Sequence, residues 1–109
     1  MKYGVKLDPL ADNDLEEIFN FVADNDSYSA AYNLISELQT LCGKLEAFPE
    51  RGHKIPEITS TSSSRYLELH YKTYRIIYQI TDNLVYIHAV IDGRRNVRDV
   101  LIQRNLRVI

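Results

Sequence analysis

The spacing of apolar residues along the chain predicts a short strand, two helices, three strands and a last helix. Residues 3–7 alternate apolar and polar side chains, which is typical of a strand. Apolar residues then recur every three or four positions, over 15–22 and again over 31–48, where Pro49 ends the second helix. The period becomes two in three segments, residues 65–71, 74–80 and 84–92. A final helix is expected from residue 97.

Capping residues stand at the predicted ends of these helices. Asp8 can accept hydrogen bonds from the unpaired amides of a first turn, and Pro9 suits the first helical position because it has no amide to leave unpaired. Asp26 or Ser27 can cap the second helix in the same way, and Asn96 can cap the last one. The Thr/Ser run at 59–64 is expected to be a flexible connection.

These elements predict the fold class β-α-α-β-β-β-α, a two-layer α+β domain that spans residues 1–109. The opening strand must join the sheet of the later strands to be stable, and the two helices should form an antiparallel hairpin on one face of that mostly antiparallel sheet. The other face is then left open or used by something else. Strand parity places Arg75 and His88 on or near this open face.

Charge is unevenly distributed in this chain of 109 residues, whose net charge is −2. Residues 1–64 carry 5 basic and 11 acidic side chains, whereas residues 65–109 carry 8 basic and 4 acidic ones. A basic C-terminal part suits an anionic partner, either nucleic acid or an acidic protein segment. The chain as a whole lacks the basicity that is typical of a strong nucleic-acid binder.

Composition also excludes several classes of protein. A single cysteine, Cys42, rules out disulfide frameworks and thiolate metal clusters, and it is expected to be buried and inert. The spacing of His53, His70 and His88 matches no metal template, so neither a metal nor a cofactor is expected. No apolar run approaches the roughly 18 residues of a membrane span, and no signal peptide is present. We therefore expect a cytoplasmic protein with no membrane contact.

Three motifs together resemble the RelE/ParE superfamily of type II toxins, also known as plasmid stabilisation proteins. They are Phe-Pro-Glu-Arg-Gly at 48–52, Tyr-Arg-Ile-Ile-Tyr at 74–78 and Gly-Arg-Arg at 93–95. The resemblance covers nearly the whole chain, and the predicted order of elements matches the fold of that superfamily. It implies a toxin that a cognate antitoxin neutralises, and that contacts DNA only indirectly, through the antitoxin.

Two activities occur in the superfamily. ParE-type members poison DNA gyrase and have no assigned catalytic residues, whereas RelE-type members cut mRNA in the ribosomal A site without metal. For such an endoribonuclease, the resemblance implies that Arg75 and Arg95 hold the phosphate, with His70 or His88 as a substitute acid or base. The lysines and the late tyrosine of the RelE pattern are missing, since Tyr66, Glu68 and Leu101 stand there.

The sequence therefore favours a ParE-like gyrase inhibitor that is not an enzyme. The alternatives are a RelE-like enzyme that acts on mRNA at the ribosome and a non-toxic interaction module derived from the family. For the gyrase inhibitor, Arg75, Arg94 and Arg95 are the expected partner-binding residues. Simpler interpretations remain open: Arg75 could be a solvated cross-strand partner of Glu68, and the other two arginines could be ordinary strand-end charges.

Overall fold

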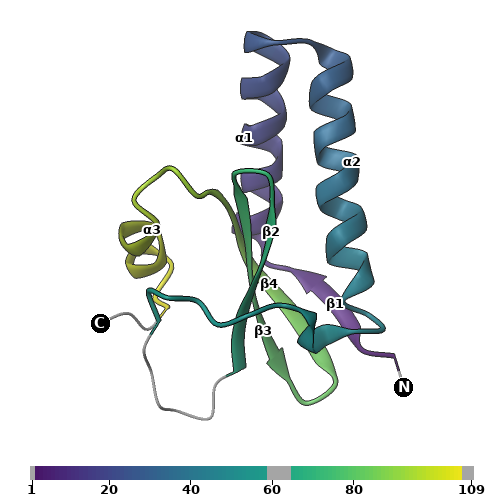
Figure 1. Ribbon diagram of the computed structural model, residues 1–109, viewed down its shortest axis with the longest axis vertical. Coiled ribbons are helices and arrows are strands. Elements are labelled where there is room, and N and C mark those ends of the chain that lie inside the picture. Colours follow the sequence, from purple (N-terminus) through teal and green to yellow (C-terminus); the bar gives the residue numbers. More distant parts are fainter. Residues whose placement is uncertain (1, 59–64, 107–109) are drawn as a thin grey trace.

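The computed structural model describes residues 2–58 and 65–106, so the connection expected at 59–64 lies outside the described residues. Figure 1 shows the elements in the predicted order, which confirms the α+β fold class. They are β1 (Gly4–Leu7), α1 (Pro9–Asn25), α2 (Tyr28–Lys44), the 3-10 helix η1 (Pro49–Arg51), β2 (Arg65–Tyr71), β3 (Tyr74–Thr81), β4 (Leu84–Asp92) and α3 (Val97–Gln103).

The four strands form one sheet in the order β1-β4-β3-β2. β1 runs parallel to β4, and the other neighbours are antiparallel, so the opening strand joins the later ones as predicted. β1 pairs only with the first half of β4, from Leu84 to Ile87. The second half of β4 therefore forms an edge of the sheet that no strand covers.

The predicted caps are present at the start of each helix. The side chains of Asp8, Ser27 and Asn96 accept hydrogen bonds from backbone amides of the first turn. α2 differs from the prediction because it ends at Lys44 rather than at residue 48. The apolar spacing in the sequence extends beyond the helix because Leu45, in the turn that follows, is also fully buried. None of the described helices has the length and apolarity that a membrane span requires.

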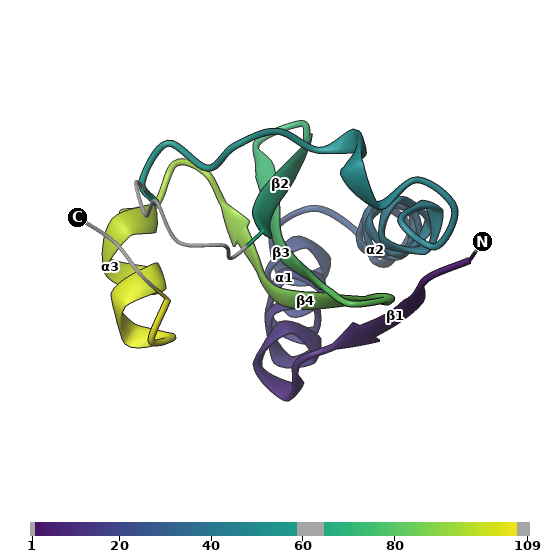
Figure 2. The same cartoon turned by 90° about the horizontal axis from the view of Figure 1, so that it is seen from below.

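The helical hairpin of α1 and α2 packs on one face of the sheet, as predicted. Of the two alternatives for the opposite face, the open face is wrong, because α3 and the segment 53–58 lie over it. Figure 2 shows α3 and α2 on opposite sides of the strands. The residues buried on the α3 side are Ile55, Ile77, Ala89, Ile91, Val97, Val100, Leu101 and Leu106. The central strands are apolar on both faces, so both faces require a cover.

A β-bulge in β4 alters which side chains share this second face. Ile77 pairs with Ala89, whereas the next residue, Tyr78, pairs with Ile87, so His88 has no partner across the ladder. Such an extra residue bends the strand and reverses the alternation beyond it. As a result, Ala89 faces the α3 side of the sheet together with Ile77.

Candidate functional site

The guanidinium of Arg75, on β3, is held between two carboxylates. Its Nε donates to Glu68 Oε1 on β2 at 2.6 Å, and its Nη1 and Nη2 donate to the two oxygens of Glu57 at 2.9 and 2.6 Å. Only 12% of the Arg75 side chain and 1% of the Glu68 side chain are exposed. The bidentate pairing with Glu57 uses the fork of N–H groups that would otherwise grip a phosphate.

This pairing favours the charged forms of Glu57 and Arg75. Hydrogen bonds from Arg75 hold the pKa of Glu57 below its ordinary value, and the hydrogen bond to Glu57, followed by that to Glu68, raises the pKa of Arg75. The cross-strand pair of Arg75 with Glu68 is confirmed. That the pair is solvated is wrong, since Glu57 closes over it from the segment 53–58.

Backbone contacts anchor this segment to the sheet. His53 and Glu68 exchange hydrogen bonds, from His53 N to Glu68 O at 3.0 Å and from Glu68 N to His53 O at 2.8 Å. One residue earlier, Gly52 N donates to the Tyr78 hydroxyl at 3.0 Å, and that hydroxyl donates to Pro49 O at 2.7 Å. A Cβ on Gly52 would lie 2.5 Å from the Tyr78 hydroxyl oxygen, so this close approach requires glycine.

Two of the three histidines lie beside the Glu68 carboxylate. Its Oε2, the oxygen that Arg75 does not bind, is 3.3 Å from His70 Nε2 and 3.7 Å from His53 Nδ1. The two imidazole rings are nearly perpendicular, at 78°, with centroids 4.7 Å apart. The antiparallel bridge, which the sequence pattern does not reveal, brings His53 to this place.

His88 lies elsewhere, at the bulge of β4. Its ring is 5.7 Å from the Tyr66 ring and 4.9 Å from the Tyr86 ring, and its Nε2 is 3.0 Å from Gln79 Oε1. Burial lowers the pKa of His88, which favours the neutral imidazole. The two histidines named as substitute acids or bases thus have separate surroundings.

Arg94 and Arg95 follow the end of β4 and face different pockets. Arg94, whose side chain is 72% exposed, pairs with Asp92 at 2.6 Å and lines a pocket of about 360 Å³ that Arg75 and His70 also line. Arg95 lines a pocket of about 250 Å³ between α1 and the strand ends. The other residues that line this second pocket are Asp14, Glu17, Ile18, Phe21, Tyr74, Val90 and Asp92.

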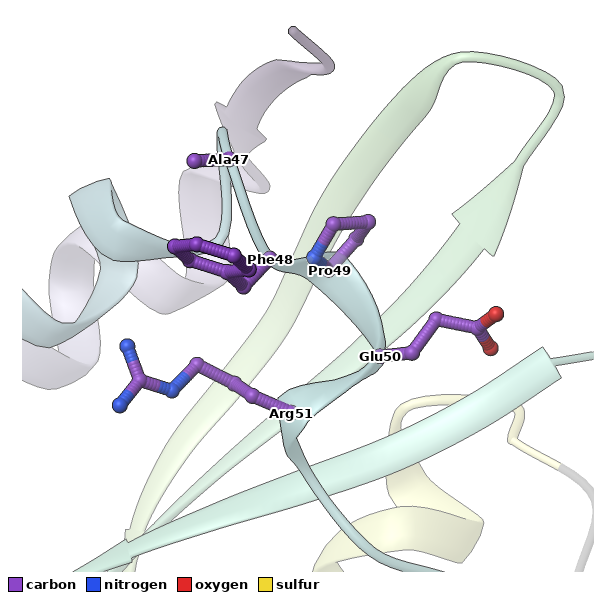
Figure 3. A pocket seen from close by; sticks show the side chains of 5 residues that line it. All are labelled: Ala47, Phe48, Pro49, Glu50 and Arg51. Atoms are coloured by element: carbon purple, nitrogen blue, oxygen red, sulfur yellow. The ribbon is translucent and has the colours of Figure 1, made fainter. Parts of the chain in front are cut away.

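A third pocket, of about 500 Å³, lies at the turn between α2 and β2, which the sequence analysis did not identify as a site. Its lining residues are Ala47, Phe48, Pro49, Glu50 and Arg51. Figure 3 shows that Phe48 and Arg51 extend to the same side of the turn, while Glu50 points away from them. The signal for this pocket was the Phe-Pro pair at 48–49, because Pro49 begins the 3-10 helix η1 and the apolar Phe48 before it is exposed.

Structural comparison defines the class of fold as that of type II toxins. The chromosomal ParDE toxin–antitoxin system from P. aeruginosa has a TM-score of 0.65 at 16% identity, over 82% of this chain and 94% of that one. The RelBE2 toxin–antitoxin complex from Mycobacterium tuberculosis has a TM-score of 0.61 at 20% identity, over 84% and 92%. A mutant of the E. coli toxin RelE in the free state has a TM-score of 0.61 at 15% identity, over 97% and 100%.

Sequence comparison identifies the family. The family model described as "ParE toxin of type II toxin-antitoxin system, parDE" matches residues 5–97. The chain therefore belongs to the ParE toxin family. A search of curated protein sequences found no match. The matched range contains the helical hairpin, β2, β3, β4 and all of β1 except Gly4, and it ends where α3 begins.

Proposed function

We propose that the chain inhibits DNA gyrase in the cytoplasm and that a cognate antitoxin neutralises it. Membership of the ParE toxin family supports a toxin of a type II system, and ParE-type toxins are gyrase poisons. The observation that carries the choice of target is the pairing of Arg75. Its guanidinium is bound by Glu57 and Glu68 and is mostly buried, which disfavours the role that an endoribonuclease would give it.

An RNA phosphate that bound Arg75 would share its guanidinium with these carboxylates, because three of the five N–H groups are donated to them. The phosphate would then lie beside two negative charges, a repulsion that works against stabilising a phosphorane. His88 lies at the bulge, with its ring tilted by 40° and 35° to the rings of Tyr66 and Tyr86 and its Nε2 beside Gln79. Arg75 and His88 therefore do not converge on one scissile phosphate, whereas His70 lies beside Glu68 and lines a pocket together with Arg75. A toxin that acts by binding a protein is favoured by the two carboxylates that already bind Arg75.

The antitoxin, we infer, covers the surface where α1 meets the strand ends. There Arg95 lines one pocket with the apolar side chains of Ile18, Phe21 and Tyr74. Carboxylates of Asp14, Glu17 and Asp92 line it too, of which Asp14 pairs with Arg104 and Asp92 with Arg94. Phe21 is 64% exposed, and Tyr28 and Tyr32 on α2 are also exposed. Large exposed apolar side chains of this kind mark interaction surfaces. The expected occupant is an antitoxin segment with apolar anchors and a carboxylate for Arg95.

Two observations support an antitoxin as the partner. The ParDE and RelBE2 structures that share this fold are both described as toxin–antitoxin assemblies. The exposed Arg95 lies just before the N-terminus of α3, where positive charge is unfavourable without an anionic partner, and the exposed Arg94 beside it pairs with Asp92. We therefore propose Arg94 and Arg95 as partner contacts, and Arg75 as the residue that holds the segment 53–58 in place.

The experiment is a brief induction of the chain in a bacterial host, with incorporation of labelled thymidine and labelled amino acids followed side by side. Early arrest of DNA synthesis with continuing protein synthesis is the expected result. Arg95→Ala should weaken neutralisation by the antitoxin, with Arg98→Ala on α3 as the matched control. Early arrest of protein synthesis would instead indicate the ribosome as target, and no change in either pool would favour a non-toxic interaction module.

A further inference from the structure

We propose that His53, Glu68 and His70 form a binding site for a divalent transition-metal ion, with Zn²⁺ as the first candidate. Within residues 2–58 and 65–106, these side chains are the one group of three His, Cys, Asp or Glu residues whose candidate ligand atoms come together, all within 4.8 Å of one another. Two imidazoles and one carboxylate are a ligand set that Zn²⁺ accepts. The inference does not depend on the toxin's target.

The distances from the Glu68 oxygen to the two histidines are close to those around a tetrahedral ion. Bonds of about 2.0–2.2 Å at tetrahedral angles separate neighbouring ligand atoms by about 3.3–3.6 Å. Glu68 Oε2 is 3.3 Å from His70 Nε2 and 3.7 Å from His53 Nδ1. Since the two imidazoles are exposed, small side-chain rotations can bring both ring nitrogens within bonding distance of one ion. Their nearly perpendicular rings already approach from different directions, as ligands around one ion must.

The carboxylate is positioned for this role by its other oxygen. Glu68 Oε1 accepts from Arg75 Nε at 2.6 Å, and Arg75 is held in turn by both oxygens of Glu57. Oε2 is thereby directed at the two histidines. Outer contacts of this kind orient metal ligands and tune their affinity. Two carboxyl groups, those of Glu57 and Glu68, share the one guanidinium of Arg75, so the cluster offers a formal negative charge that a bound cation would offset.

The backbone holds the two histidines at this spacing. His53 lies opposite Glu68 in an antiparallel bridge, with both backbone hydrogen bonds formed, while His70 is two residues along the same strand as Glu68. The ligands therefore come from a strand and from a segment fixed to that strand. A site built in this way requires little rearrangement to bind an ion, so less binding energy is spent on ordering the chain.

The fourth position of the ion would face solvent. The His53 and His70 side chains are 60% and 51% exposed, and His70 also lines the pocket of about 360 Å³ that Arg94 lines. Three protein ligands with one open position leave room for water or for one ligand atom from a partner. When bound, the ion would link the segment 53–58 to β2, in addition to the backbone bridge between His53 and Glu68 that already joins them.

The test uses the full chain without a histidine tag, titrated with Zn²⁺ in competition with a chromophoric chelator. We expect one ion per chain. His53→Ala and His70→Ala should each weaken binding by at least the 10- to 100-fold that loss of an outer-shell partner typically costs. His88→Gln is the matched control, because His88 lies outside the cluster. The affinity of this variant for Zn²⁺ should equal that of the wild type.

A second measurement identifies the ligand geometry. Co²⁺ should give the intense visible absorption of a tetrahedral complex in the wild type and in His88→Gln, and lose it in His70→Ala. Absence of Zn²⁺ binding by the wild type would overturn the proposal. Binding that survives both alanine substitutions, or that falls equally in the His88 control, would also overturn it. Both ligand variants change exposed side chains, so they are expected to fold.

Discussion

Asp14 of α1 and Arg104, which follows α3, form an ion pair at 2.6 Å although 90 residues separate them in sequence. They pair over the edge of β4 that β1 leaves uncovered. Asp14 Oδ2 accepts from Val90 N at 2.9 Å, and Arg104 Nη1 donates to His88 O at 3.1 Å. Two side chains thus satisfy backbone groups that a strand would otherwise pair, and they attach the C-terminal helix to the first helix across the sheet edge.

This pair should contribute strongly to stability. Arg104→Ala leaves the buried Asp14 carboxylate without its cation, and breaking a buried pair in this way costs about 3–5 kcal/mol. We expect a loss of roughly 3 kcal/mol in the free energy of unfolding, measured by urea denaturation. Asp24→Asn, an exposed change on α1, is the control. A value for Arg104→Ala within about 0.5 kcal/mol of the wild type, as for ordinary surface changes, would contradict this role.

The Tyr78 hydroxyl should matter for stability as well. Tyr78→Phe removes the group that accepts from Gly52 N and donates to Pro49 O, so both backbone atoms lose their partner. Unsatisfied buried groups cost about 1–3 kcal/mol, and we expect a loss in that range by urea denaturation. Tyr32→Phe, on the exposed side of α2, should leave the free energy of unfolding unchanged. Equal free energies of unfolding for the two variants would show that the Tyr78 hydroxyl does not anchor the turn at Pro49 and Gly52.

Cys42 is expected to be unreactive in the folded protein. Burial raises the pKa of its thiol to about 11, so at pH 8 only about one molecule in a thousand carries the thiolate. Because the chain has one cysteine, the rate of labelling by a disulfide reagent reports this site alone. Labelling should be slow in buffer and fast in urea. A rate in buffer that equals that of a free thiol would contradict the burial of Cys42.

His88 should make stability depend on pH in the mildly acidic range. Its pKa is lowered in the fold, so the unfolded chain binds the proton more tightly. The stability contributed by the neutral ring is complete above the unfolded pKa of about 6.5 and is lost as pH falls below it. Urea denaturation at about pH 7.5 and about pH 5.5 measures this loss. His88→Gln should reduce this loss of stability between the two pH values. If the loss is as large in the variant as in the wild type, the pH dependence comes from other groups.

The sequence was sufficient to predict the helices and strands, because periodicity and capping residues are local signals. Asp8, Ser27 and Asn96 cap the helices that they were expected to cap. The fold class and the family followed from the order of these elements and from short motifs. The second face of the sheet was misjudged because the position of α3 depends on which apolar faces meet, and no local pattern fixes that.

The candidate site depended on contacts that are distant in sequence. Strand parity placed Arg75 and Glu68 side by side, but Glu57 reaches them from a segment without any period. His53 joins His70 only through the bridge to Glu68. The bulge at His88 changes which side chains share a face, and a single residue inserted into a ladder has no signature in the hydrophobic pattern.

The central claim is that this ParE-family toxin acts on DNA gyrase, and the most direct measurement is the supercoiling activity of purified gyrase in the presence of the purified chain. We expect supercoiling to fall and cleaved DNA to accumulate, with activity restored by the cognate antitoxin. Arg75→Lys, which keeps the charge but loses the paired contacts, tests whether the segment 53–58 contributes to this effect. Full gyrase activity at a molar excess of toxin, together with cleavage of mRNA on translating ribosomes, would contradict the claim.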